Sequence, residues 1–118
     1  MKYMLLIYMD ENCLSASERE HCYNESAQVA RELSSSGKYL DAAPLHPTST
    51  ATSVRVRDGK QLITDGPFAE TREQLGGYFL IDAKNLDEAI GVAKKIPGGR
   101  WGTVEIRPVM EVEGLPTN

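Results

Sequence analysis

The sequence contains little cysteine, no long apolar run and no leader-like start. Its two cysteines, Cys13 and Cys22, are too few for a disulfide framework, so both are expected to be reduced thiols. The longest apolar stretch, residues 4–9, is far shorter than the ~20 residues that span a bilayer. One lysine precedes this stretch and an Asp-Glu pair follows it, which does not fit a signal peptide. We therefore expect a cytoplasmic protein without a membrane segment.

Concentrated positive charge is also missing. The chain has 13 Lys and Arg against 17 Asp and Glu, a formal net charge of −4, and its longest basic run is Lys94-Lys95. A nucleic-acid binder needs a basic face for phosphate contacts, so we expect no nucleic-acid partner. No Gly-rich phosphate-binding pattern occurs, and neither His21 nor His46 has a second ligand at metal-binding spacing. The sequence therefore predicts no cofactor and no metal site.

The composition that remains is that of one globular domain. The 118 residues have a mass of 13.0 kDa, with 41% apolar and 25% charged residues, close to ordinary globular usage. A chain of this length has little room for a second domain. We expect a single domain over residues 1–112 and a tail at residues 113–118.

Strand patterns recur along this domain. Large apolar residues alternate onto both faces of residues 2–9 and 78–82, which predicts two strands that need cover on both sides. Residues 39–45 and 103–112 predict two further strands. The last of these carries Val104 and Ile106 on one face and charged residues on the other.

A β-hairpin is predicted between the strand at residues 39–45 and the strand at residues 78–82. Asp58-Gly59 favours a type I′ turn, because both central positions of that turn need positive φ. It joins residues 52–57 to residues 61–65. The alternation in the first of these segments predicts that Val54 and Val56 point inward.

Two amphipathic helices complete the pattern. Ser17 and Glu20 fit a capping box at the start of the first helix, and Gly37 is placed to end it. Asn85 and Glu88 fit the start of the second helix. The expected buried positions at helical spacing are Cys22, Val29 and Leu33 in the first helix and Leu86, Ala89, Ile90, Ala93 and Ile96 in the second.

The predicted order is β-α-β, hairpin, β-α-β. This is a ferredoxin-like split βαβ pattern of the α+β class with an inserted β-hairpin. Two helices cover only one face of its antiparallel sheet, although two strands are apolar on both faces. The simplest way to bury the second face is to pack it against the same face of another copy, so we expect a homodimer that forms a dimeric α+β barrel.

The most unusual segment is residues 64–78. It combines three carboxylates and an arginine with the rigid turn Gly66-Pro67. One interpretation is a pocket rim where Asp65 or Glu70 transfers a proton and Arg72 holds an anion. The alternative is a structured loop in which Glu70 and Arg72 pair with each other or with neighbours.

Four blocks of the sequence resemble a known family. DGPFAETREQLGGYFLID closely resembles the signature of the DGPF-domain branch of the YCII-related family. KYMLLIYMDE, LHPTSTATSVRVRDGK and VEIRPV are similar to other blocks of that family. The resemblance covers about residues 1–109, and it implies a dimeric α+β barrel with a ferredoxin-like protomer.

The resemblance implies less about activity. Some relatives are dehydrochlorinases of small ring-derived acids, and the fold is shared with lactone isomerases and small monooxygenases. Many DGPF proteins are encoded beside extracytoplasmic-function sigma factors, which implies a regulatory association. Catalytic members of the wider family share a His-Asp pair, but the matching region here, Lys95-Ile96-Pro97-Gly98-Gly99, has no aspartate. We therefore do not transfer that pair to this chain.

Other candidate side chains lie outside the turn. His46 follows a strand end, and its ordinary pKa near 6.5 suits proton transfer, although it also fits an exposed loop residue. Arg107 is a candidate anchor for a carboxylate, with pairing to Glu105 as the alternative. Phe68 and Tyr78 are candidate substrate contacts beside the turn.

Two functions follow from these candidates. The first is a cofactor-independent isomerase or lyase in which Asp65, His46 or Glu70 removes a proton next to a carboxylate or enol, while Arg72 binds the anion. The second is a non-catalytic protein that binds an unknown metabolite or regulates a partner such as a sigma factor. The sequence does not name the ligand.

Overall fold

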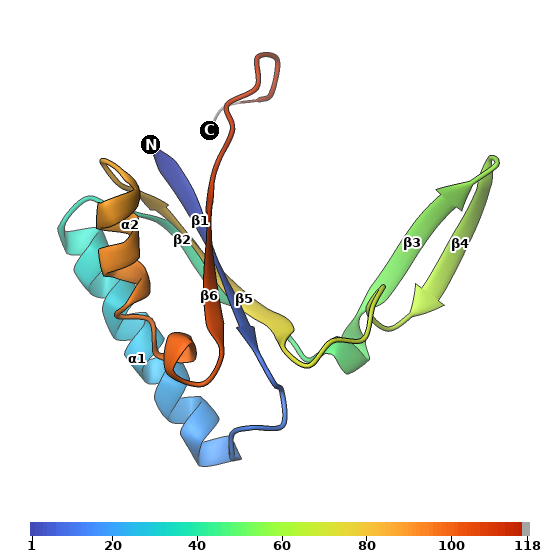
Figure 1. The fold of residues 1–118 in the computed structure, drawn as a ribbon, viewed down its shortest axis with the longest axis horizontal. Coiled ribbons are helices and arrows are strands. Elements are labelled where there is room, and N and C mark those ends of the chain that lie inside the picture. The colour runs from blue at the N-terminus through green and yellow to red at the C-terminus, as the bar shows by residue number, and fades with distance from the viewer. Residues whose placement is uncertain (117–118) are drawn as a thin grey trace.

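The computed structural model describes residues 1–116 and shows a helix-covered sheet from which one hairpin stands apart (Figure 1). The elements in chain order are β1 (Lys2–Met9), α1 (Ala16–Ser35), β2 (Tyr39–Pro44), β3 (Thr52–Arg57), β4 (Lys60–Asp65), β5 (Gln74–Asp82), α2 (Leu86–Ala93) and β6 (Thr103–Pro108). Two short 3₁₀ turns, Thr48–Thr50 and Pro97–Arg100, lie between them. No helix within residues 1–116 is long and apolar enough to cross a membrane.

The main sheet has four strands in the order β2-β5-β1-β6, and every neighbouring pair is antiparallel. Helices α1 and α2 cover one face of it (Figure 1). This topology confirms the predicted ferredoxin-like α+β fold. β3 and β4 form a separate two-stranded sheet, which is the predicted insertion.

The core lies between the helices and this sheet. Leu5 and Ile81, on the two adjacent central strands, are completely inaccessible to solvent. The buried cluster around them consists of Tyr3, Val29, Leu33, Phe79, Ala83, Ala89, Val92 and Ile96. Alternate residues of each strand enter this cluster, because successive strand side chains point to opposite faces.

The start of α1 differs from the prediction by two residues. The Ser15 N–H donates to Glu18 Oε1 at 2.9 Å and the Glu18 N–H donates to Ser15 Oγ at 3.2 Å, so the capping box is Ser15 with Glu18. Hydrogen bonds from the backbone and side chain of Ser15 lower the pKa of the Glu18 carboxyl group. The predicted box of Ser17 and Glu20 is therefore wrong. The predicted end is confirmed, because Gly37 takes φ +75° after the last turn.

The hairpin turn is confirmed, but the orientation of its valines is not. Asp58 and Gly59 have φ of +52° and +75°, as a type I′ turn requires. Val54 and Val56 nevertheless remain 62% and 59% exposed, so their predicted inward position is wrong in the single chain. The reason is that β3 and β4 pair only with each other and lie outside the main sheet.

Two smaller corrections concern the second half of the chain. Leu86 is 51% exposed, so it does not belong to the buried stripe of α2, whose buried residues are Ala89 and Val92. β6 ends at Pro108 rather than at residue 112. Of the predicted tail at residues 113–118, the last two residues lie outside the described part of the chain.

A side chain at Gly102, where the chain turns into β6, is expected to destabilise the fold strongly. A Cβ atom there would overlap the carbonyl oxygen of Tyr8 and lie 3.0 Å from Met9 Cα. These are backbone atoms of a central strand, which cannot shift far to make room. Gly102→Ala should therefore lower the free energy of unfolding by about 2–4 kcal/mol. Thermal unfolding followed by circular dichroism measures the loss.

Gly91 provides the matched control for this substitution. A Cβ atom at Gly91, inside α2, would meet no atom within 4 Å. Gly91→Ala should stabilise the protein by up to ~1 kcal/mol, because alanine favours a helix. Equal melting temperatures for Gly102→Ala and the wild-type protein would contradict the close approach of Gly102 to β1.

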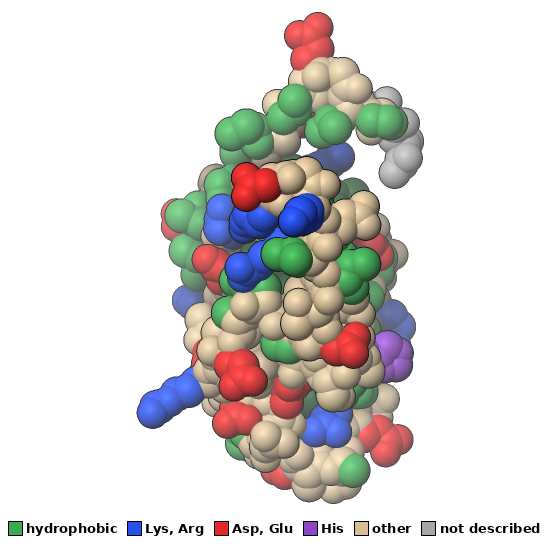
Figure 2. All heavy atoms as spheres, turned by 90° about the vertical axis from the view of Figure 1, so that its right-hand side faces the viewer, with side chains coloured by type: hydrophobic (Ala, Val, Ile, Leu, Met, Phe, Trp, Pro, Cys, Tyr) green, Lys and Arg blue, Asp and Glu red, His purple; other side chains and the backbone are tan. Residues whose placement is uncertain are grey.

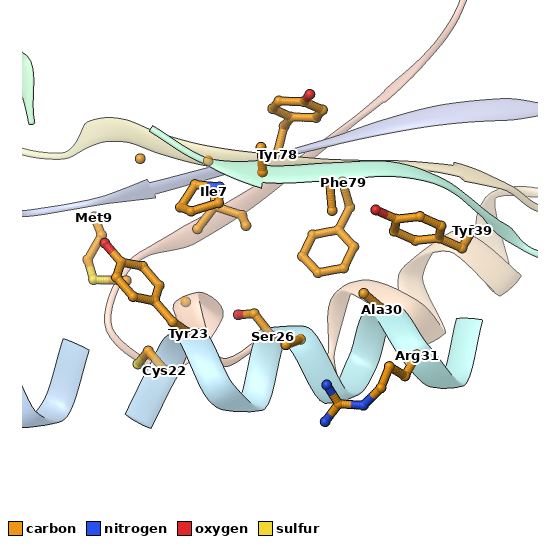
Figure 3. Close-up of a pocket in the computed structure, with 17 residues that line it drawn as sticks. Ile7, Met9, Cys22, Tyr23, Ser26, Ala30, Arg31, Tyr39, Tyr78 and Phe79 are labelled. Atoms are coloured by element: carbon orange, nitrogen blue, oxygen red, sulfur yellow. The ribbon is translucent and has the colours of Figure 1, made fainter. Parts of the chain in front are cut away.

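The second face of the main sheet, which we call the open face, has no cover within the described chain. It carries the strand residues that alternate with the core residues: Met4, Leu6, Tyr8, Tyr78, Leu80, Glu105 and Arg107. Tyr78 points away from α1, on the opposite side of the sheet from Phe79 (Figure 3). The open face is thus mainly apolar along the two central strands, with charged groups at the β6 edge and Asp41 at the β2 edge.

Candidate functional site

A cavity of about 410 Å³ lies between α1 and the main sheet, and we call it the α1 cavity. In Figure 3, Ile7 and Phe79 point into this space from the sheet, and Tyr23 and Ser26 lie opposite them on α1. Its further lining residues are Met9, Cys22, Ala27, Ala30, Arg31, Tyr39, Ala42, Ala43, Pro44, Gly76, Gly77, Tyr78 and Gly98. This volume is within the range of about 300–1,000 Å³ that is typical of small-molecule pockets.

The α1 cavity exists because small residues line both of its walls. Ala27 and Ala30 face it from α1, and Ala42 and Gly77 face it from the sheet. A Cβ atom at Gly77 would lie 3.0 Å from the Ala43 carbonyl oxygen, so the backbones of β2 and β5 approach closely there. The space that larger side chains would fill is left for a ligand.

Few polar groups line the α1 cavity. The Cys22 thiol is buried, and desolvation raises its pKa, which keeps it protonated and apolar at neutral pH. The Tyr23 hydroxyl and the Ser26 hydroxyl are the nearby hydrogen-bonding groups on α1 (Figure 3). The guanidinium of Arg31 turns outward to Gln28, whose Oε1 accepts a 2.7 Å hydrogen bond. The α1 cavity therefore suits a mainly apolar ligand.

A more polar hollow of about 500 Å³ adjoins the α1 cavity, and we call it the polar mouth. The two spaces share the lining residues Met9, Cys22, Tyr23 and Gly76. The polar mouth adds Asp10, Glu11, Asn12, Leu14, Arg19, Leu45, His46, Pro47, Thr48 and Ser49. The exposed His46 thus borders the polar end of an apolar cleft.

Glu11 fixes the wall of the polar mouth that carries His46. Its carboxylate accepts hydrogen bonds from the Thr48 N–H at 2.7 Å and the Thr48 hydroxyl at 2.6 Å. The Glu11 N–H donates to Gln74 Oε1 at 2.9 Å, and Arg19 donates to the Glu11 carbonyl at 3.1 Å. Sequence reasoning did not single out Glu11, because its partners Thr48 and Gln74 are distant in the chain.

Asp65 and Glu70 line a third hollow, of about 460 Å³, which we call the DGPF hollow. The backbone at Gly66 takes φ +105°, and its N–H donates to the Ala51 carbonyl at 2.7 Å, which holds the turn in place. Thr48 and Ser49 line both this hollow and the polar mouth. The structure therefore brings Asp65 and Glu70 together and places His46 in the adjoining hollow.

The remaining candidates lie elsewhere. Phe68 is 79% exposed and Arg72 is exposed, and neither lines the three hollows just described. Tyr78 and Arg107 lie on the open face. There the Tyr78 hydroxyl donates to Asp41 Oδ2 at 2.7 Å, which raises the pKa of Tyr78.

Arg107 is part of a small polar group at the β6 edge of the open face. Its Nη1 lies 3.8 Å from Glu105 Oε2. Burial and the neighbouring Glu105 carboxylate raise the pKa of Tyr8, and Arg107 opposes this effect. The side chains of Tyr78 and Arg107 are thus on the opposite side of the sheet from α1, although Tyr78 is among the residues that line the α1 cavity. Within residues 1–116, no group of three or more His, Cys, Asp and Glu side chains is arranged to hold a metal ion.

The fold and the three adjoining hollows define a class: a ferredoxin-like α+β protein with a cleft of small-molecule size between α1 and the sheet. Comparisons with known proteins give the family. The model of the YCII-related domain matches residues 1–113. An uncharacterized protein of Rhizobium meliloti (strain 1021) is 39% identical over 114 residues, which cover 92% of each chain. The chain belongs to the YCII-related family.

Proposed function

We propose that this YCII-related protein, as a member of the DGPF branch, binds a small, mainly apolar molecule in the α1 cavity and transfers a proton on it without a cofactor. The observation that carries the proposal is the position of His46, at the polar end of an apolar cleft and next to the hollow of Asp65 and Glu70. The reaction class is isomerisation or elimination. The free thiols Cys13 and Cys22 fit a reducing compartment such as the cytoplasm.

The chemistry needs one base and one enolisable carbon. His46, or Asp65 from the DGPF hollow, takes the proton from a carbon next to a carboxylate or carbonyl, and the electron pair of the broken C–H bond forms an enolate. Returning the proton to another carbon completes an isomerisation, whereas loss of a β-leaving group completes an elimination. A histidine imidazole can both accept and donate a proton, which suits both directions of transfer. Arg72, the anion anchor expected from the sequence, lines none of the three hollows and is left out of this proposed site.

The proposed assembly is a homodimer. Met4, Leu6 and Leu80 are apolar residues on the two central strands of the open face. A second copy that seats its own open face on this one buries both surfaces and yields an α+β barrel. The α1 cavity lies on the helix side of each sheet, so one dimer has two separate sites.

The proposal is tested by deuterium exchange into a panel of small enolisable carboxylates and lactones, with phenylpyruvate as the first compound. In deuterated buffer, proton NMR should show faster loss of the acidic C–H signal with wild-type protein than without it. His46→Asn and Asp65→Asn each replace one candidate base. The variant that loses at least about 100-fold of the exchange rate while it still binds identifies the base.

His21→Asn is the matched control. His21 lies on the exposed side of α1, with its Nε2 3.0 Å from Glu25 Oε1, and it lines none of the three hollows. This variant should exchange at the wild-type rate. Binding of panel compounds without exchange would contradict catalysis and support the second hypothesis, a non-catalytic metabolite-binding protein that regulates a partner such as a sigma factor.

A further inference from the structure

The hairpin of β3 and β4, residues 52–65, is an arm that extends from the body of the protein (Figure 1). Every residue of β4 is exposed, and so is every residue of β3 except Ser53. The base of the arm is fixed: Ser53 Oγ donates to the Gly66 carbonyl at 2.8 Å, and the Gly66 N–H donates to the Ala51 carbonyl. A two-stranded hairpin is at best marginally stable by itself in water, so this arm needs a packing partner.

The strand register divides the arm into an apolar and a basic face. Val54 pairs with Ile63, and Val56 occupies the next position on that face, so these three side chains form an apolar face. They are 62%, 65% and 59% exposed, respectively. The opposite face carries Arg55, Arg57, Lys60 and Leu62. Figure 2 shows basic side chains gathered in the upper half of the view that looks onto the arm.

The surface area of the chain indicates how large the missing contact is. A compact protein of 13.0 kDa exposes about 6,300 Å², whereas this chain exposes 8692 Å². Its radius of gyration is 16.1 Å, against about 13.5 Å for a compact domain of this length. The excess of about 2,400 Å² is near the upper end of the ~1,000–2,500 Å² that one protomer buries in an obligate homodimer. The arm and residues 109–116 are the segments that extend from the body (Figure 1).

The position and charge of the arm favour a second copy of this chain as its partner. The arm lies on the side of the main sheet that faces away from α1 and α2, so a copy seated on the open face lies beside it (Figure 1). Residues 52–65 contain three basic and two acidic side chains, a net charge of +1, whereas the other 104 residues carry −5. A basic arm is therefore attracted to the acidic body of another copy.

From these observations we infer that the arm is exchanged between protomers: the apolar face of each arm packs on the body of the partner. This inference rests on the proposed homodimer and adds a second contact to it. In the dimer, Val54, Val56 and Ile63 lose their exposure to water. This explains why all three lie on one face of the arm, although the arm buries no residues of its own.

The test is sedimentation equilibrium of the full chain and of the triple variant Val54→Thr, Val56→Thr, Ile63→Thr. Threonine keeps the β-branched shape and strand preference of these positions, and circular dichroism checks that the variant folds. We expect the dimer dissociation constant of the triple variant to increase at least about 100-fold. Leu62→Thr, on the basic face of the same arm, should change it by less than about 5-fold.

Hydrogen exchange of the arm amides gives a second measurement. Arm amides should be protected at concentrations where the dimer forms, and they should lose this protection on dilution to monomer. A wild-type dimer with unprotected arm amides, unchanged by the triple substitution, overturns arm exchange and leaves the open-face dimer intact. A wild-type protein that sediments at 13.0 kDa throughout overturns the proposed dimer and arm exchange together.

Discussion

Replacing Ala30 with tryptophan is expected to reduce the affinity of the α1 cavity for small aromatic acids at least about 10-fold, a loss of ~1.4 kcal/mol or more. Ala30 is half-buried on α1 and faces the cavity below Phe79 (Figure 3). An indole at this position occupies the space that the ligand needs. It also packs against the core cluster that Ala30 already touches, so the fold should keep its stability.

Calorimetric titration with phenylpyruvate, or with the tightest compound of the panel, measures this loss. Ala30→Leu fills less of the same space and should give an intermediate affinity. Gln28→Trp adds the same indole to the exposed side of the same helix and should bind like the wild type. Unchanged affinity for both Ala30 variants would show that ligands bind outside the α1 cavity.

The fold was predictable from the sequence because its signals are local. The I′ turn at Asp58-Gly59 depends on two residues, and both take the expected positive φ. The alternation of Val104 and Ile106 against Glu105 and Arg107 survives in β6, where the two apolar residues pack against the core. In β6, the alternation of neighbouring residues is enough to predict which side chains pack against the core.

Errors arose where two local signals were equal or where position depended on distant parts of the chain. Ser15-Glu18 and Ser17-Glu20 have the same capping-box spacing, and the sequence does not distinguish them. The orientation of Val54 requires knowing that its hairpin lies outside the main sheet. The spacing of apolar residues reveals neither which serine caps the helix nor that the hairpin lies outside the main sheet.

Most of the residues that line the α1 cavity escaped sequence reasoning for a different reason. Charged and turn-forming residues directed attention to the DGPF segment, whereas the cavity is made by small residues such as Ala27, Ala30 and Gly77 on separate elements. Small residues on separate elements form no recognisable sequence motif. The fold brings the predicted candidates Asp65, Glu70 and His46 to two hollows that share Thr48 and Ser49, and the hollow of His46 adjoins the cavity.

The proposed ligand binding and the proposed assembly use opposite sides of the main sheet, so the two should be separable by mutation. The α1 cavity lies between α1 and the sheet, and the open face lies beyond it (Figure 3). Leu6 is on the open face and does not line the α1 cavity, so a substitution there leaves the lining of the cavity unchanged. A monomeric variant should therefore retain its ligand affinity, unless residues of the second copy reach the site.

Leu6→Lys is expected to convert the proposed dimer into a monomer. Leu6 lies on central strand β1, opposite Tyr78 and Glu105 on the adjacent strands, and its side chain is on the open face. A lysine there places an ammonium group in the proposed contact, where burying an unpaired charge costs several kcal/mol. The dissociation constant should rise at least about 100-fold, equivalent to ~2.7 kcal/mol.

Sedimentation equilibrium at micromolar concentration distinguishes the two states, since the protomer mass is 13.0 kDa and the dimer has twice that mass. Leu86→Lys makes the same substitution at an exposed leucine on α2, on the helix side of the sheet, and should remain dimeric. If Leu6→Lys also remains dimeric while wild-type protein forms a dimer, the copies associate through a surface other than the open face. In that case the polar group of Tyr8, Glu105 and Arg107 stays in contact with water rather than inside a barrel.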